Sequence, residues 1–206
     1  MARRFRTTYG RKTVVPFKER DINNMMIICK KKRDESDNDD IKRMWDRNYM
    51  MIVIGINTAF RIEDILHLKV DSFKNGIIYL REFKTNKEQQ FELNPNLWKD
   101  IDSYISRNKL VSGEYLFQSR KGLNEPITRV RAWQIIKKLA DEVHVNYCVG
   151  PHSLRKYFAR QFYEKTGDII TLQRMLNHSS PQVTLIYICW GNDDVYKARK
   201  DFYLGN

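Results

Sequence analysis

The chain has 206 residues, of which 37 are lysine or arginine and 25 are aspartate or glutamate, so its formal net charge is +12. A hydrophobic content of 42% excludes a disordered chain, and the positive charge favours an anionic partner such as nucleic acid. Three widely spaced cysteines without a C-x-x-C pair indicate neither a disulfide framework nor a zinc site. No apolar run is long enough for a secretory signal or a membrane span, so we expect a cytoplasmic protein without membrane contact.

The N-terminal half is expected to begin with a basic segment followed by helices. Residues 1–15 contain arginines and a lysine but no acidic residue, which predicts a flexible basic arm or the remnant of a linker before one folded domain at 16–206. Apolar residues at helical spacing predict helices over about 21–32 and 41–58, with the acidic run 34–40 as a solvated loop between them in which Asp39 or Asp40 is a candidate start of the second helix.

The remaining elements are expected to be helices around one small sheet. The segments 76–81 and 89–93 have the residue types of strands, and the polar, lysine-rich turn 84–87 joins them. Further segments are predicted as a short helix at 62–68, a helix from Pro95 to about 108, an extended piece at 115–117, and helices over about 128–144, 153–165, 169–176, 181–188 and 193–203. The predicted fold class is mainly α with a small antiparallel β-sheet (α+β).

Near the C-terminus, histidine, arginine and tyrosine residues follow one another at informative spacings. His152 and Arg155 are three residues apart and therefore share one face of a helix. Tyr187 comes nine residues after His178, close enough for one helix-turn-helix to bring both into a single pocket. A tyrosine surrounded by cations and a base can act as a nucleophile. This set of residues predicts a phosphodiester-cleaving site with a tyrosine nucleophile.

Four segments resemble motifs of the tyrosine recombinases, the phage integrase family. The sequence TAFRIEDILHL at 58–68 resembles the first motif of the family, and HSLR at 152–155 matches its H-x-L-R. LNHSS at 176–180, followed by Tyr187, resembles L-G-H-x-S with the nucleophile nine residues later. Lys84 falls in the hairpin turn where the family has its catalytic lysine. The resemblance extends over roughly residues 16–203 and implies the catalytic-domain fold of these DNA breaking and rejoining enzymes.

The resemblance implies a role for each matched side chain. Two arginines would bind the phosphate with donors that stay charged, a tyrosine would attack it, and a lysine would protonate the 5′-oxygen leaving group. Two histidines would act as proton acceptor and as hydrogen-bond donor. The implied catalytic residues are Arg61, Lys84, His152, Arg155, His178 and Tyr187, with Asp64 holding neighbouring groups of the site in place.

Some assignments stay open at this point. Lys87 is three residues from Lys84 and competes with it, although the lysine of the family precedes the polar turn, which favours Lys84. The family usually assigns the base role to the histidine of H-x-x-R, but the sequence does not decide between the two histidines. The chain also departs from the common pattern, because Ala59 and Asn177 replace common glycines and Lys156 stands where many members carry histidine.

The resemblance implies a site-specific DNA recombinase of the integrase type, a DNA strand transferase. It would cleave and rejoin double-stranded DNA through a 3′-phosphotyrosine intermediate without a metal, ATP or another cofactor. We expect a bacterial or phage-encoded protein that is a monomer or weak oligomer when free and a homotetramer on DNA. The segment 191–206 would dock on a neighbouring protomer or fold back on the core.

Two alternatives remain. One is a non-catalytic DNA-binding regulator with the same fold, and the other is a type IB topoisomerase that relaxes supercoils as a monomer. We also expect the N-terminal core-binding domain that such recombinases usually carry to be absent.

Overall fold

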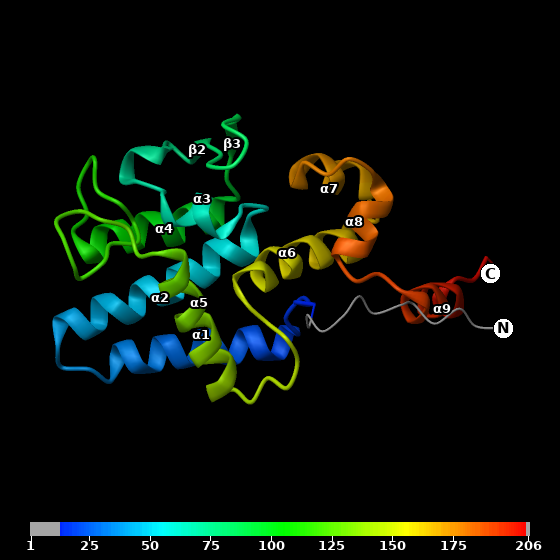
Figure 1. Cartoon of the computed structure of the whole chain (residues 1–206), viewed down its shortest axis with the longest axis horizontal. Coiled ribbons are helices and arrows are strands. Elements are labelled where there is room, and N and C mark those ends of the chain that lie inside the picture. Colours follow the sequence, from blue (N-terminus) through cyan, green and yellow to red (C-terminus); the bar gives the residue numbers. More distant parts are fainter. Residues whose placement is uncertain (1–12, 205–206) are drawn as a thin grey trace.

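Helices make up most of the chain, and one small antiparallel sheet lies at the edge of the larger group of helices (Figure 1). This computed structural model describes residues 13–204. Its helices are α1 (Glu19–Asp34), α2 (Asp39–Asn57), α3 (Ile62–Leu66), α4 (Pro95–Asn108), α5 (Arg129–Glu142), α6 (Pro151–Thr166), α7 (Ile169–Leu176), α8 (Pro181–Tyr187) and α9 (Asn192–Asp201), with a 3-10 turn at Val70–Ser72. The predicted fold class is confirmed.

The sheet has one strand more than the sequence analysis predicted. Its order is β1 (Phe73–Lys74), β2 (Ile77–Arg81) and β3 (Glu88–Glu92), with both neighbouring pairs antiparallel. Strand β1 has two residues, too few to show the alternation by which a strand is found. The turn into β2 is Asn75-Gly76, in which both residues have positive φ. This dipeptide is the preferred two-residue hairpin turn, and it is the signal that would have identified β1.

The loop between α1 and α2 is shorter than predicted. Asn38 accepts hydrogen bonds through Oδ1 from the backbone N–H groups of Asp40 (2.9 Å) and Ile41 (3.1 Å), so α2 begins at Asp39, one of the two candidate starts. The carboxylates of Asp39 and Asp40 then lie in the first helical turn, where the helix dipole favours negative charge. Most of the acidic run therefore belongs to the two helices and their caps rather than to a loop.

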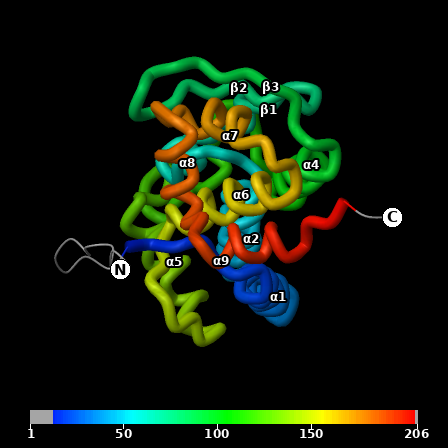
Figure 2. Tube along the Cα trace, turned by 90° about the vertical axis from the view of Figure 1, so that its right-hand side faces the viewer, coloured from blue at the N-terminus to red at the C-terminus, as the bar shows by residue number. Residues whose placement is uncertain are grey.

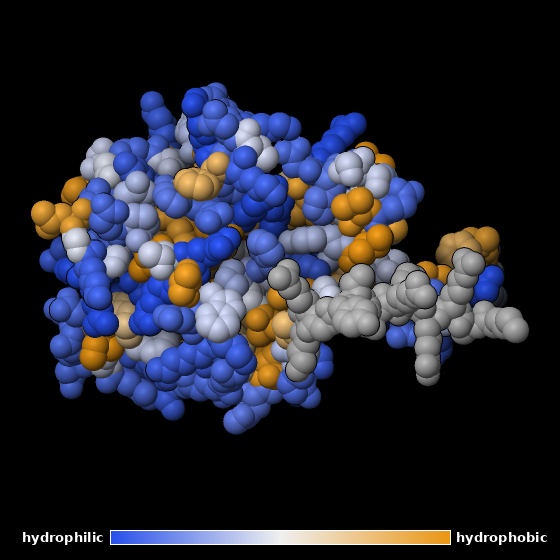
Figure 3. Space-filling view, viewed as in Figure 1, coloured by the Kyte–Doolittle hydropathy of each residue, from blue (hydrophilic) through white to orange (hydrophobic). Residues whose placement is uncertain are grey.

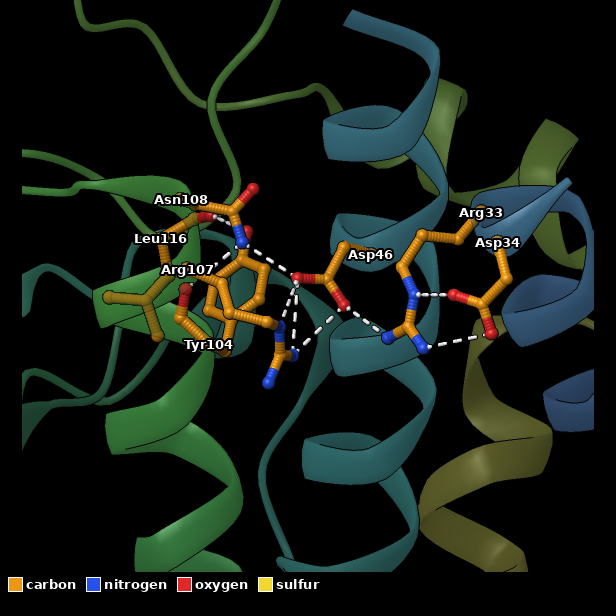
Figure 4. Close-up of polar contacts among 7 residues, drawn as sticks. All are labelled: Arg33, Asp34, Asp46, Tyr104, Arg107, Asn108 and Leu116. Carbon is orange, nitrogen blue, oxygen red and sulfur yellow. Dashed lines mark hydrogen bonds and ion pairs between the residues drawn. The ribbon is translucent and has the colours of Figure 1, made fainter. Parts of the chain in front are cut away.

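Asp46, buried on α2, joins three helices (Figure 4). Its carboxylate accepts hydrogen bonds from Arg33 Nη1 of α1 at 2.9 Å, and from Arg107 Nη2 at 3.0 Å and Asn108 Nδ2 at 2.7 Å at the end of α4. Two guanidinium groups and an amide thus satisfy the buried charge, which would otherwise be costly to remove from water. This contact fixes the end of the helical group that lies away from α6.

The helix that carries His152 and Arg155 crosses α2 at a glycine. A side chain at Gly55 would place its Cβ 2.8 Å from Cδ1 and 3.1 Å from Cβ of Leu154, so the two backbones approach as closely as they do because Gly55 has no side chain. Beyond this crossing, α6 packs with α7 and α8 around a second, smaller cluster of buried residues. In Figure 2, α7 and α8 lie above α6, on the side where the hairpin of β2 and β3 is found.

Helix α9 projects beyond α8, at the end of the molecule opposite the loop between α1 and α2 (Figure 1). It contains no buried residue. Arg160 of α6 holds its first turn, because the guanidinium pairs with Asp194 and lies 4.8 Å from the centre of the Trp190 ring. The rest of α9 and residues 202–204 are mostly exposed to solvent.

The basic arm predicted for residues 1–15 lies mostly outside the described residues. Of its last residues, Val15 donates its backbone N–H to the carbonyl oxygen of Cys148 at 3.1 Å. Between Thr13 and Leu204, no helix has both the length and the apolar character that crossing a membrane requires.

Candidate active site

Arg61 is positioned by the first turn of α3 and by the β2–β3 hairpin. It is the N-cap residue of α3, and its backbone N–H donates to Asp64 Oδ2 at 3.2 Å. The other carboxylate oxygen of Asp64 accepts the backbone N–H of Phe83 at 2.8 Å, and Asp64 itself is only 2% exposed. Asp64 therefore ties the start of α3 to the turn that carries Lys84.

A second buried carboxylate, Glu82, binds the Arg61 side chain directly. Glu82 is 4% exposed and follows the last residue of β2. Its Oε2 accepts hydrogen bonds from Arg61 Nη1 at 2.9 Å and from Thr85 Oγ1 at 2.5 Å, and its Oε1 accepts one from Gln89 Nε2. Glu82 could not be identified from the sequence, because a glutamate at the end of a strand is usually solvated and only the tertiary structure reveals its burial.

The two candidate lysines lie on opposite sides of the same turn. Lys84 is exposed, and its ammonium has no hydrogen bond or ion pair among residues 13–204. The Nζ of Lys87 donates to Oδ1 of Asn177 at 3.2 Å, so the hairpin touches the end of α7. Asn177 has a φ of 59° and ends α7 in the left-handed conformation, directly before His178. The choice of Lys84 over Lys87 stays a prediction.

The first turn of α6 carries His152 and Arg155. Pro151 at the start of the helix and the Ser153 hydroxyl, which accepts the backbone N–H of Gly150 at 3.2 Å, fix the beginning of this helix. Arg155 is 7% exposed, and its Nη2 donates to the carbonyl oxygen of Leu176 at 2.9 Å, whereas its Nε is buried without a hydrogen-bond partner in the described part of the chain. A buried donor without a partner is uncommon in folded proteins, which marks Arg155 as a candidate functional residue.

His178 and Tyr187 meet edge to face in the turn and helix after α7. Their ring centres are 5.0 Å apart, with an interplanar angle of 73°. The Nδ1 of His178 lies 3.1 Å from Oγ1 of the buried Thr184, which sets the orientation of the imidazole. Tyr187 is the last residue of α8. The nine-residue spacing therefore brings the two side chains together, as the sequence analysis expected.

Lys156 lies over the ring of the candidate nucleophile. It is 7% exposed, and its Nζ lies 4.8 Å from the centre of the Tyr187 ring. In the sequence, Lys156 stands out only as a departure from the pattern of the motif. Its contact with Tyr187 depends on the crossing of α6 with the end of α8, which the chain order does not reveal.

The charges of the site act on one another across segments that are distant in the sequence. Burial raises the pKa of Tyr187, and the positive charges of Arg155 and Arg61 oppose that rise. Burial also lowers the pKa of His178, and the same two arginines lower it further. Partial burial also lowers the pKa of His152, and the positive charges of Arg155 and Lys156 lower it further. Arg61 thus shares one electrostatic environment with both histidines and the tyrosine.

Metal ligands do not cluster in the described part of the chain. Between residues 13 and 204, no group of three or more histidine, cysteine, aspartate or glutamate side chains is arranged to hold a metal ion. The positive charge of the site comes from arginine and lysine side chains.

Comparison with known proteins identifies the family. The model of the phage integrase family matches residues 16–190. YoeC, a probable integrase/recombinase of Bacillus subtilis (strain 168), is 38% identical over 157 residues, which cover 76% of this chain and 84% of that protein. The tyrosine recombinase XerA of Pyrococcus furiosus is 28% identical over 144 residues, or 68% of this chain and 49% of that protein. The chain spans about half the length of XerA and of the XerD relatives it matches.

Solved structures share the fold. The crystal structure of XerA recombinase superposes with a TM-score of 0.71 at 21% identity and covers 94% of this chain and 68% of that chain. XerH bound to its palindromic difH substrate gives a TM-score of 0.68 at 20% identity, with 91% of this chain and 53% of that chain covered. The extent of the family match, the identity to YoeC and the shared fold together show that the chain belongs to the phage integrase family, the tyrosine recombinases.

Proposed function

We propose that this chain is a DNA strand transferase in which Tyr187 attacks a scissile phosphate of double-stranded DNA. The observation that carries this proposal is the convergence of Tyr187, His178 and Arg155 with Arg61, which is distant from all three in the sequence, in one electrostatic environment. A buried phenol, two guanidiniums and two neutral imidazoles suit phosphoryl transfer, because the transition state gains negative charge on oxygens that arginine can bind.

The proposed step forms one bond and breaks one. The Oη of Tyr187 bonds to phosphorus, its proton passes to an imidazole, and the bond from phosphorus to the 5′-oxygen breaks. The Nζ of Lys84 gives a proton to that leaving oxygen, which leaves a 3′-phosphotyrosine and a 5′-hydroxyl. A 5′-hydroxyl from a second duplex then reverses the step. Because the phosphodiester energy is kept in the phosphotyrosine, the cycle needs no ATP. Either His152 or His178 takes the phenol proton, and Arg61 and Arg155 bind the phosphate.

The assembly we propose is a homotetramer that joins two duplexes. The observation that supports this assembly is the exposure of the C-terminal segment. Helix α9 has no buried residue, and Phe202, Tyr203 and Leu204 are 69–84% exposed. Figure 3 shows hydrophobic residues exposed at this end of the molecule. A single chain would gain from covering them, and a neighbouring protomer is the proposed cover. The proposed place of action is the cytoplasm of a bacterium.

A covalent-capture experiment tests the proposed function without knowledge of the DNA site. The protein is mixed with a pool of duplexes that have a randomised centre and are lightly nicked with DNase I, so that a cleaved strand diffuses away and traps the enzyme. SDS-resistant protein–DNA complexes are isolated and sequenced. We expect complexes enriched in one DNA sequence, and tryptic peptides in which the DNA is attached to Tyr187.

Two variants make the result specific. Tyr187→Phe should keep the thermal unfolding midpoint and lose every covalent complex, whereas Tyr196→Phe on α9 should keep both. Covalent complexes without any sequence enrichment, together with relaxation of supercoiled plasmid, would instead favour a topoisomerase. Sequence-selective binding without a covalent complex would overturn the catalytic proposal and favour a regulator.

A further inference from the structure

We propose that Glu82 is a positioning residue of the cleavage reaction, which holds the Arg61 guanidinium and the Lys84 turn in one fixed arrangement. This inference rests on the proposed function, since it assumes that Arg61 binds the phosphate and that Lys84 protonates the leaving group. Glu82 itself touches neither the phosphate nor the leaving group in this proposal.

The hydrogen bonds of Glu82 support both halves of the inference. One carboxylate oxygen, Oε2, receives Arg61 Nη1 at 2.9 Å and Thr85 Oγ1 at 2.5 Å. The other, Oε1, receives the side-chain amide of Gln89 on β3. The backbone of Glu82 also closes the turn, because its N–H donates to the carbonyl oxygen of Lys87 and its carbonyl oxygen accepts the N–H of Asn86, each at 2.8 Å. One side chain thus connects the phosphate-binding arginine with the lysine turn.

The two neighbours of Lys84 in the sequence each bind a carboxylate, and both of these carboxylates also bind Arg61. The predecessor, Phe83, donates its backbone N–H to Asp64, and the successor, Thr85, donates its hydroxyl to Glu82. Asp64 in turn binds the backbone of Arg61, and Glu82 binds its side chain. The ammonium of Lys84 is free of protein partners within residues 13–204, although the residues on both sides of it are fixed. Such an arrangement fixes the base of a flexible side chain while leaving its charged end for the DNA.

The ionisation of Glu82 is consistent with this role. Burial alone would raise its pKa, but hydrogen bonds from Thr85 and Arg61, the charge of Arg61 and the bond from Gln89 together lower it. Glu82 is therefore a carboxylate at neutral pH and only accepts hydrogen bonds. A negative charge beside Arg61 opposes the binding of an anionic phosphate, so the benefit of Glu82 must lie in geometry. Its loss should accordingly slow cleavage without weakening DNA binding.

The experiment compares Glu82→Gln with Glu88→Gln, a matched loss of one negative charge on the same hairpin. Glu88 pairs with Arg81 at the surface, where its side chain is 76% exposed. Covalent-complex formation is measured on the nicked duplex recovered from the capture experiment. We expect Glu82→Gln to form it about ten- to hundredfold more slowly, and Glu88→Gln to match the unsubstituted protein. With Tyr187→Phe also present, Glu82→Gln should bind this duplex at least as tightly as Tyr187→Phe alone.

A sulfur-bridged duplex separates the two contacts of Glu82. In this substrate a 5′-sulfur replaces the scissile oxygen, and the leaving thiolate needs no proton because a thiol has a pKa of about 8.5. Thr85→Val loosens only the lysine turn, so its slower cleavage should recover on this duplex to the rate of the unsubstituted protein. Glu82→Gln also weakens the hold on Arg61, which must still bind the phosphate of this duplex. The slower cleavage by Glu82→Gln should therefore recover only in part.

Four outcomes would overturn the inference. They are equal rates for Glu82→Gln and Glu88→Gln, full recovery of Glu82→Gln on the sulfur-bridged duplex, weakened DNA binding, or a Thr85→Val variant that cleaves normally. Thermal unfolding midpoints of all variants report on folding, and Thr85→Val keeps the test decisive if Glu82→Gln does not fold. If the unsubstituted protein forms no covalent complex, it is the proposed function that fails, which is distinguishable from failure of the inference alone.

Discussion

The ammonium of Lys156 lies 4.8 Å from the centre of the Tyr187 ring, and the lysine is only 7% exposed. A cation over the face of an aromatic ring is attracted to the electrons of the ring, and the attraction is stronger where water is excluded. The same positive charge favours the phenolate over the phenol. Lys156 therefore holds the ring of the candidate nucleophile in place, and we expect its charge to lower the cost of removing the phenolic proton.

Replacing this lysine should weaken the nucleophile. Lys156→Met keeps the length and apolar stem of the side chain but removes its charge. We expect this variant to form the covalent complex about tenfold more slowly at neutral pH, because a buried cation–ring contact contributes about 1–2 kcal/mol. The phenolate titration of Tyr187, measured as the absorbance difference from a Tyr187→Phe partner, should move to higher pH. Lys165→Met, at the exposed end of the same helix, serves as the control. A Lys156→Met variant with an unchanged rate and titration would contradict the role given to the charge.

Acid should affect both cleavage and stability through the two histidines of the site. The pKa of His178 and that of His152 are lowered from their usual value near 6.5, so both rings are neutral at pH 7. As the pH falls, these histidines are protonated at a higher pH in the unfolded chain than in the folded protein. The unfolded state therefore binds more protons, and the free energy of unfolding decreases as the pH falls below about 7. Cleavage of bound DNA should decline at a lower pH, where the folded-state imidazoles become charged.

Paired histidine variants measure this dependence. Urea unfolding across this pH range should show a smaller loss of stability for His178→Asn than for the unsubstituted protein. His144→Asn, an exposed residue with a φ of 57° that asparagine tolerates, is the control. A pH dependence that is the same in all three proteins would show that other groups cause it.

The order of the elements could be predicted from the sequence because most of them are long and strongly patterned. Helix α2 is recognised by the spacing of its apolar residues, and α4 by the proline at its first helical position. Strand β1 was missed because it has only two residues, although Asn75-Gly76 marks its turn. The start of α2 at Asp39 agrees with one of the two starts considered, whereas α1 continues to Asp34, which was assigned to the loop because acidic residues at a helix end resemble solvated loop residues.

Only those residues of the candidate site that belong to a sequence motif could be predicted. Residues matched to a motif, such as Arg155 and Tyr187, do lie close together. Glu82 and Lys156 lie outside those motifs, and each acts through a contact between segments that are distant in sequence. A buried glutamate and a buried lysine resemble solvated ones in a sequence, because burial depends on what the rest of the fold places against them.

The buried carboxylate of Asp46 should be among the most sensitive positions for stability. We expect Asp46→Ala to cost about 2 kcal/mol of the free energy of unfolding, since it removes the buried carboxylate that Arg33, Arg107 and Asn108 share. Asp141→Ala removes a surface ion pair with Lys137 and should cost less than about 0.5 kcal/mol. Urea unfolding measures both. Equal costs would mean that the network in Figure 4 contributes no more than a surface pair.

The crossing of α2 and α6 at Gly55 should link folding stability to the candidate site. A methyl group there would lie 2.8 Å from Leu154 Cδ1, so Gly55→Ala must displace α6 or strain Leu154, at a cost of about 2 kcal/mol. Gly191→Ala meets no atom within 4 Å and has an ordinary backbone conformation, so its stability should change by less than about 0.5 kcal/mol. Leu154→Ala alone leaves a cavity, but in combination with Gly55→Ala it removes the shorter contact, to Cδ1, and leaves only the contact to Cβ, so the double variant should lose less stability than the sum of the two single losses. Because α6 carries His152 and Arg155 on its first turn, Gly55→Ala should also slow covalent-complex formation, and the second substitution should restore part of the rate. Strict additivity in urea unfolding would mean that the two residues do not meet as the fold requires.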